Sequence, residues 1–162
     1  METLTNAEKA RRIISANNYL TLATSDLNGK PWAAPLYYAY DKDFNFYFIS
    51  ASDSLHVKHI QENENVSVAI FDTHDPVGEG DGVQLEGIAH RLGILDLPYA
   101  LYVYFRRRFP EEIERIKNGH FPTEYIGNSF FSFIKLKPTK VFTLDLSVKD
   151  FDKRLEVELD KP

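Results

Sequence analysis

The sequence predicts a mainly β domain with inserted helices, built as a closed or split barrel of six to seven strands. Short runs rich in β-branched and aromatic residues recur at even spacing, and most are joined by turns too short for parallel pairing. Helical segments stand between some of these runs, and helices that cap the openings favour a barrel over a sandwich. The 12 Phe and 9 Tyr residues fit the core of such a sheet.

The first elements are a helix and a β-hairpin. Thr5 and Glu8 match a capping box, which predicts a helix over about residues 6–18. A strand over residues 19–26 follows the helix. Asn28-Gly29 then predicts a type I′ turn, because both residues tolerate a positive φ.

The middle of the chain continues the sheet and adds a second helix. The returning hairpin strand covers residues 31–40, where Pro35 cannot donate a ladder hydrogen bond and so marks an edge, a bulge or a change of sheet. A further strand over residues 44–50 ends in small polar residues. Ser52 or Ser54 can cap the helix that follows, which ends near residue 63.

The second half combines strands with a helical insert. Residues 66–71 and 83–92 are expected to be strands, Asp96-Leu97-Pro98 opens a partly buried helix, and residues 111–118 form a second short helix. Strands over residues 130–136 and 140–146 should pair about Pro138. We expect one domain over residues 1–162, with a helix over 1–18, a barrel core over 19–92, an insert over 96–119, closing strands over 129–146 and a tail over 147–162.

Composition excludes several classes of protein. The chain has no cysteine, so disulfides, zinc–thiolate sites and thiol chemistry are excluded. The net charge of −5 argues against general nucleic-acid binding, and the short basic run at residues 106–108 is typical of a solvated helix face. No signal-peptide core and no run of ~20 apolar residues is present. We therefore expect a soluble, cytoplasmic protein that acts without nucleic acid or membrane.

Most motifs that identify a catalytic or nucleotide site are absent. The sequence has no Gly-x-Ser-x-Gly, no Gly-x-Gly-x-x-Gly and no Walker motif. His56 and His59 stand at i and i+3 on a helix, but a metal site needs at least a third ligand. The acidic residues between Asp72 and Asp81 lack the spacing of a calcium loop. We predict no metal site.

One segment has the chemistry of an anion site. Where a strand ends and a helix begins, backbone N–H groups point outward and carry partial positive charge. Hydroxyl, imidazole and ammonium donors gather at this junction, namely Ser50, Ser52, Ser54, His56 and Lys58. The alternative is that a serine simply caps a surface helix and Lys58 is solvated.

The order of several motifs resembles the pyridoxamine 5′-phosphate oxidase-like family of FMN-binding split barrels. These motifs are the Asn-Gly hairpin followed by AAPLYY, the run FYFIS, Ser54-Leu55-His56, the strand NENVSVAIF, and GVQLEGIAHRL. The resemblance covers residues 20–92 and, more loosely, residues 130–144. It implies a homodimer in which both chains build each of two FMN sites.

The resemblance also implies roles for individual residues. The ring or ribityl chain of FMN would lie along Ala34, Pro35, Leu36 and Tyr37, and the ring edge and ribityl chain would meet Ile49 and Ser50. Ser54, His56 and Lys58 would hold the phosphate. Gln84 lies near a position that often contacts flavin in the family, although alignment on Gly87 moves that position to Gly82.

The departures from the family pattern exclude one activity. Pyridoxamine 5′-phosphate oxidase itself has an Arg-Lys pair where this chain has Leu55-His56, and its C-terminal Trp and Arg have no counterpart here. Synthesis of pyridoxal phosphate is therefore not expected. Because an unperturbed histidine titrates near ~6.5, FMN affinity should fall between about pH 6 and pH 8 through His56.

The favoured function is an FMN-dependent oxidoreductase that passes hydride or electrons between a reduced nicotinamide and an unidentified acceptor. One alternative is a non-catalytic split barrel that binds haem, a deazaflavin or another flat ligand, with His56, His59 or His90 as contacts. Another is a dimer without a cofactor.

Overall fold

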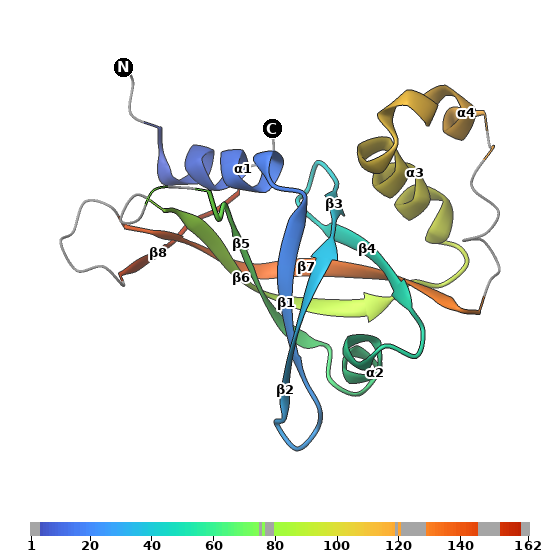
Figure 1. Ribbon diagram of the computed structural model, residues 1–162, viewed down its shortest axis with the longest axis horizontal. Coiled ribbons are helices and arrows are strands. Elements are labelled where there is room, and N and C mark those ends of the chain that lie inside the picture. The colour runs from blue at the N-terminus through green and yellow to red at the C-terminus, as the bar shows by residue number, and fades with distance from the viewer. Residues whose placement is uncertain are drawn as a thin grey trace.

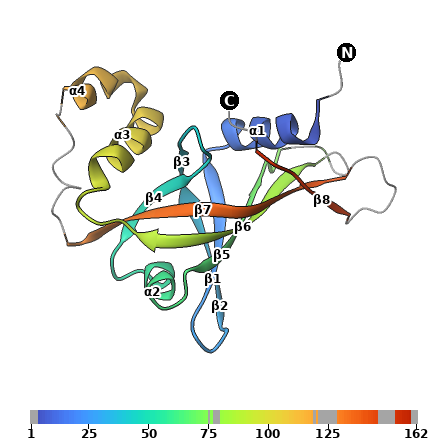
Figure 2. The same cartoon turned by 180° about the vertical axis from the view of Figure 1, so that it is seen from behind.

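The computed structural model describes residues 4–74, 76, 80–118, 120, 129–145 and 153–159. Figures 1 and 2 show a curled sheet with helices at its margins. The helices are α1 (Asn6–Ala16), α2 (Leu55–Glu62), α3 (Leu97–Arg108) and α4 (Ile113–Lys117), with a 3-10 turn at Pro110–Glu112. The strands are β1 (Tyr19–Ser25), β2 (Pro31–Tyr37), β3 (Ala39–Tyr40), β4 (Phe46–Ala51), β5 (Asn65–Phe71), β6 (Gly82–Arg91), β7 (Phe131–Leu144) and β8 (Arg154–Glu156).

The strands form one antiparallel sheet that curls into a split barrel. Their order is β2-β1-β5-β6-β7-β4-β3, and β8 pairs with β7. The two ends of this order, β2 and β3, are consecutive parts of one extended segment that is interrupted at Tyr38. One segment therefore pairs first with β1 and then with β4. Pro35 lies in β2, at the edge of the sheet, where its missing N–H is tolerated.

Two hydrophobic clusters hold these elements together. The barrel interior contains inward residues of most strands together with one face of α1 and of α2, including Leu22, Phe46 and Phe48. A second cluster packs α3 against the outside of the sheet through Tyr104, Phe105 and residues of β4 and β7. The capping box predicted at the start of α1 is present. None of the helices in the described part of the chain is long and apolar enough to cross a membrane.

The first hairpin does not contain the predicted type I′ turn. Gly29 has a φ of 80°, but Asn28 does not have a positive φ. The Gly29 N–H donates to the Asp26 carbonyl, and the Asp26 carboxylate accepts from the N–H groups of Asn28 and Lys30. The loop thus has one left-handed residue, because the side chain of Asp26 stabilises a wider turn than the Asn-Gly pair alone implies.

The turn between β3 and β4 repeats this hydrogen-bond pattern, with Asp41 in the place of Asp26. Its carboxylate accepts from the N–H groups of Asp43 and Asn45, and also from the Asn45 side chain and the Tyr47 hydroxyl. Phe44 takes the left-handed position with a φ of 56°. A bulky residue rarely adopts this conformation, and here the Phe44 ring stacks on Tyr40 at 5.6 Å.

The strand pair predicted about Pro138 is instead one continuous strand, β7. Pro138 lies opposite Gly87, and the pairing register shifts between Glu86 and Gly87. Lys140 pairs with Glu86, so Thr139 is an extra residue in a β-bulge. A proline is tolerated at a bulge because the ladder hydrogen bond there is already lost. Leu146, at the end of the predicted pair, and Gly119, expected to close the second insert helix, lie outside the described residues.

Arg107 of α3 joins the insert to the N-terminal helix. Its Nη2 atom donates to the carbonyl oxygens of Ile14, Ser15 and Asn17, at 3.4, 3.3 and 2.5 Å. α1 has no basic residue in its own last turn, so Arg107 supplies the positive charge that stabilises a helix C-terminus. The middle residue of the basic run is therefore structural.

Candidate functional site

The predicted anion-binding segment lies at the junction of β4 and α2, below the barrel in Figure 1. Ser50 is near the end of β4, Ser54 occupies the N-cap position of α2, and Lys58 is exposed on the second turn. The buried face of α2 consists of His56, Val57, His59 and Ile60. The helix packs against β1, β2 and β6.

His56 is turned into this junction. Its Nε2 atom lies 2.7 Å from the Ser50 hydroxyl and 3.3 Å from the Ser54 hydroxyl. Burial, and secondarily the nearby His59, lowers the pKa of His56 below its ordinary value. The titration of His56 therefore moves to the acid side of the range predicted from the sequence. His56 contributes a neutral hydrogen-bonding group at neutral pH, and the predicted loss of FMN affinity between pH 6 and pH 8 is no longer expected from it.

The buried imidazole makes the stability of the protein depend on pH. A base whose pKa is lowered by folding binds its proton more readily in the unfolded chain, so stability is full above the ordinary pKa of about 6.5 and declines below it. We expect the chemical denaturation midpoint to fall between pH 6.5 and pH 5. His56→Gln should reduce this slope, and His120→Gln, at an exposed histidine, should leave it unchanged. Equal slopes in all three proteins would contradict the assignment.

The N-terminus of α2 has no side-chain cap, contrary to the prediction for Ser52 or Ser54. The Ser54 hydroxyl donates to the Ala51 carbonyl at 2.7 Å, and no side chain among the described residues accepts from the first-turn N–H groups. The Ser52 hydroxyl lies 2.9 Å from that of Ser132 on β7. Backbone donors with partial positive charge thus remain beside a group of serine hydroxyls, which is a favourable site for an anion.

The residues predicted to line a flat ligand lie on β2 and β4. Along β2, Ala34 is buried, Pro35 is exposed, and Leu36 and Tyr37 are half-buried. The ring of Tyr37 packs edge-on against Tyr19 and Tyr104. Ile49 on β4 is half-buried. Ala34 and Leu36 face the barrel interior, whereas Pro35 and Tyr37 face the outside of the sheet. Within one chain these side chains therefore do not form a single wall.

Gln84 lies far from this junction within one chain. It pairs with Phe142 of β7, whereas Ser50 pairs with Ser132 of the same strand. These two β7 positions are ten residue steps apart, which spans about 30 Å in an extended strand. Gln84 is exposed beside a surface cavity of about 440 Å³ that includes Thr21, Phe142 and Arg154.

The histidines do not form a metal site with other residues in the described part of the chain. No group of three His, Cys, Asp or Glu side chains gathers there in a way that could hold an ion. His59 is buried with its Nδ1 atom 3.1 Å from the Thr24 hydroxyl, and His56 contacts Ser50 and Ser54. His90, the third histidine expected as a contact for a flat ligand, is half-buried on β6.

Ser132 is a residue of the junction that sequence reasoning missed. It is buried, comes from β7, and meets Ser52 only because β4 and β7 pair along their length. No local motif surrounds Ser132, so only knowledge of the strand register could have found it.

Comparison with known proteins identifies a family whose profile matches most of the chain. The profile of the family described as pyridoxamine 5′-phosphate oxidase matches residues 7–145. No curated protein matches the sequence significantly. A solved haem-binding protein from Mycobacterium smegmatis is similar with a TM-score of 0.69 and 23% identity, over 97% of this chain and 59% of that one. The present chain thus spans about three-fifths of the mycobacterial protein.

This chain covers nearly the whole length of two further solved structures. A putative pyridoxamine 5′-phosphate oxidase from Listeria innocua has 18% identity and a TM-score of 0.62, over 86% of this chain and 98% of that one. General Stress Protein 26 from Bacillus anthracis has 20% identity and a TM-score of 0.60, over 93% and 98%. At these identities the similarity describes the fold alone.

Proposed function

This chain belongs to the pyridoxamine 5′-phosphate oxidase family of split barrels, and we propose that it is a dimeric FMN-binding oxidoreductase. In this role it passes hydride or electrons between a reduced nicotinamide and an acceptor that remains to be identified. Bound FMN would supply the redox chemistry, while the protein positions the ring and keeps water from it. The chain has Leu55-His56 where pyridoxamine 5′-phosphate oxidase itself has an Arg-Lys pair. We therefore do not propose that it synthesises pyridoxal phosphate.

The uncapped start of α2 is the observation that carries the proposal. Within the part of the chain that the structure describes, the first-turn N–H groups of this helix have no side-chain acceptor, and Ser50, Ser52 and Ser54 lie on the segment that leads into the helix. Lys58, exposed one turn further along, supplies the cation. Donors of these kinds suit a phosphate dianion, and charge-assisted bonds contribute roughly 1.5–3 kcal/mol each.

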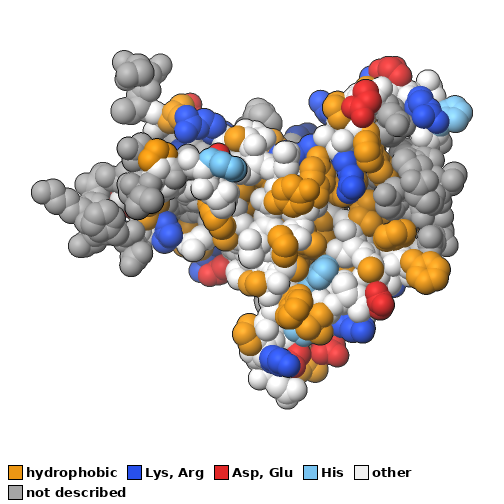
Figure 3. Space-filling view, in the orientation of Figure 1, with side chains coloured by type: hydrophobic (Ala, Val, Ile, Leu, Met, Phe, Trp, Pro, Cys, Tyr) orange, Lys and Arg blue, Asp and Glu red, His pale blue; other side chains and the backbone are white. Residues whose placement is uncertain are grey.

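A second copy of the chain would complete the site. Gln84 is about 30 Å from Ser50 along the sheet, so a flavin held by the α2 junction could meet that position only from another chain. Exposed apolar side chains lie on the outer face of the sheet, including Ala33 and Pro35 of β2 and Phe71 of β5. Figure 3 shows hydrophobic side chains gathered over the middle of this face.

The visible spectrum of protein purified without added cofactor tests the function. Flavin bands, together with quenching of FMN fluorescence on titration and a dimer mass by light scattering, are the expected results. A Soret band would identify haem, and not FMN, as the ligand. A colourless protein that leaves FMN fluorescence unchanged would overturn the proposal.

A single substitution should strengthen phosphate binding. Leu55 is 41% exposed at the first position of α2, where the family's oxidase has arginine. Leu55→Arg should lower the Kd for FMN about tenfold, which corresponds to about 1.4 kcal/mol from a new charge-assisted contact. The measurement is fluorescence quenching of FMN at constant ionic strength.

The hairpin tip offers a matched control. Leu27 is 75% exposed on the loop between β1 and β2, so Leu27→Arg changes the net charge equally without reaching α2. An equal gain in the two variants would show general electrostatic attraction and not a phosphate at the α2 start.

A further inference from the structure

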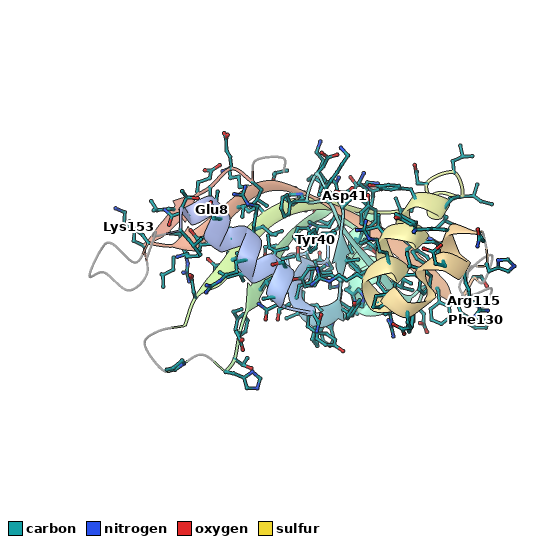
Figure 4. All side chains as sticks on the ribbon, turned by 90° about the horizontal axis from the view of Figure 1, so that it is seen from above. Glu8, Tyr40, Asp41, Arg115, Phe130 and Lys153 are labelled. Atoms are coloured by element: carbon teal, nitrogen blue, oxygen red, sulfur yellow. The ribbon has the colours of Figure 1, made fainter. Side chains whose placement is uncertain are left out.

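A second cleft, separate from the α2 junction, lies between α3 and the turn that joins β3 to β4. Its volume is about 510 Å³. Tyr40, Tyr99 and Tyr102 provide aromatic walls, and Lys42, Arg106 and Arg107 provide positive charge. In Figure 4, Tyr40 and Asp41 mark the sheet side of this cleft, between α1 and α3.

The charges of the cleft favour an anion, although the whole chain has a net charge of −5. Asp41 is the one acidic residue among those that line it, and its carboxylate accepts from Asn45 and the Tyr47 hydroxyl. Burial and then Asp41 raise the pKa of Tyr99, so the positive side of the cleft is the α3 side, where Arg106 and Arg107 lie. Among the described residues, the exposed Lys42 ammonium pairs with the exposed carboxylate of Asp43, at 3.3 Å. A contact of this kind is weak and easily exchanged for a ligand.

Arg106 is the cation that is available for a ligand. It is exposed on the last turn of α3, and within the described residues it has no hydrogen-bond or ion-pair partner. Arg107 is already fixed through Nη2 by three carbonyls at the C-terminal end of α1, and it also interacts with Tyr38. The two arginines therefore differ, because Arg106 is exposed and Arg107 is a fixed part of the wall.

The aromatic walls are held in place by their own packing. Arg107 lies over the ring of Tyr40 at 4.8 Å, and Phe44 stacks on the same ring. Tyr99 packs edge-on against Tyr47 at 6.2 Å between ring centres. Rigid aromatic rings beside arginine form a surface on which a flat conjugated ligand can pack while its negative group meets the guanidinium.

We propose that this cleft binds an aromatic carboxylate, with the ring against Tyr99, Tyr102 and the edge of Tyr40, and the carboxylate on Arg106. This site is independent of the FMN site, because it uses α3 and the β3–β4 turn and none of the residues assigned to the phosphate. The proposal also gives the helical insert a role in binding a small molecule.

Calorimetric titration of the intact protein with 2-naphthoate tests this assignment. We expect saturable binding that is weakened about tenfold by Arg106→Gln, since one charge-assisted contact is lost. Arg12→Gln, at an exposed position of α1, is the matched control and should bind as the parent does. Tyr102→Leu should also weaken binding.

Two comparisons with other ligands complete the test. The uncharged 2-naphthamide should bind at least tenfold more weakly than 2-naphthoate, as should the non-aromatic cyclohexanecarboxylate. Saturating FMN should leave the affinity for 2-naphthoate unchanged. Absence of binding, equal binding by Arg106→Gln, or displacement by FMN would each overturn the assignment. The first two outcomes do not bear on whether FMN binds at α2.

Discussion

Gly87→Ala is expected to lower the free energy of unfolding by about 3 kcal/mol, because the added methyl group would collide with the neighbouring strand. A Cβ atom at this position would lie 2.8 Å from the Lys137 carbonyl oxygen and 3.0 Å from Leu136 Cδ2. Real Cβ atoms do not approach backbone oxygen so closely. The bulge in β7 must therefore shift, or β6 and β7 must separate where their register changes.

Gly93 provides the matched control. It follows β6, and a Cβ atom there would meet nothing within 4 Å. Gly93→Ala should change the free energy of unfolding by less than about 0.5 kcal/mol. In thermal unfolding, the Gly87 variant should melt roughly 6–12 °C lower, since 1 kcal/mol corresponds to about 2–4 °C in a chain of this length. Similar melting temperatures for both variants would show that the close approach is relieved without strain.

Asp41→Ala is expected to lower the free energy of unfolding by about 2–3 kcal/mol. The Asp41 carboxylate is buried and accepts hydrogen bonds from two backbone N–H groups, from the Asn45 amide and from the Tyr47 hydroxyl. Removing it leaves the Tyr47 hydroxyl, which is also buried, without this acceptor. An unsatisfied buried hydroxyl alone costs about 1–3 kcal/mol.

The first hairpin offers a control with the same turn geometry. The Asp26 carboxylate accepts only from the N–H groups of Asn28 and Lys30, and the surrounding loop is exposed. Asp26→Ala should therefore cost about 1 kcal/mol or less. Urea denaturation of both variants measures the difference. If the two substitutions were equally destabilising, the buried contacts of Asp41 would contribute nothing beyond the turn itself.

The part of the fold that was predictable is the part encoded by neighbouring residues. The capping box at Thr5 and Glu8 placed α1, and the alternating runs placed the strands, because these signals act within a few residues. Pro138 was misinterpreted as a break between two strands. A proline is tolerated within this strand because Gly87, 51 positions earlier, lies opposite Pro138 where the pairing register shifts.

The same limit applies to the candidate site. The spacing of Ser50, Ser54 and Lys58 is local and predicted a strand end next to a helix start, which the structure contains. Whether a side chain on α2 faces solvent or the sheet depends on how the helix packs, so the burial of His56 and the fall of its pKa could not be predicted from spacing. The pairing of Ser52 with Ser132 requires the register of β4 on β7.

The contact of Arg107 with α1 has a consequence for how the molecule opens. Loss of α3 from the sheet would remove the guanidinium from three carbonyls at the C-terminal end of α1 and from the faces of Tyr38 and Tyr40. The two helices are about 90 residues apart in sequence but share this one support. Local unfolding should therefore involve α1 and α3 as a single cooperative unit, and the insert is part of the folding unit and not an appendage to it.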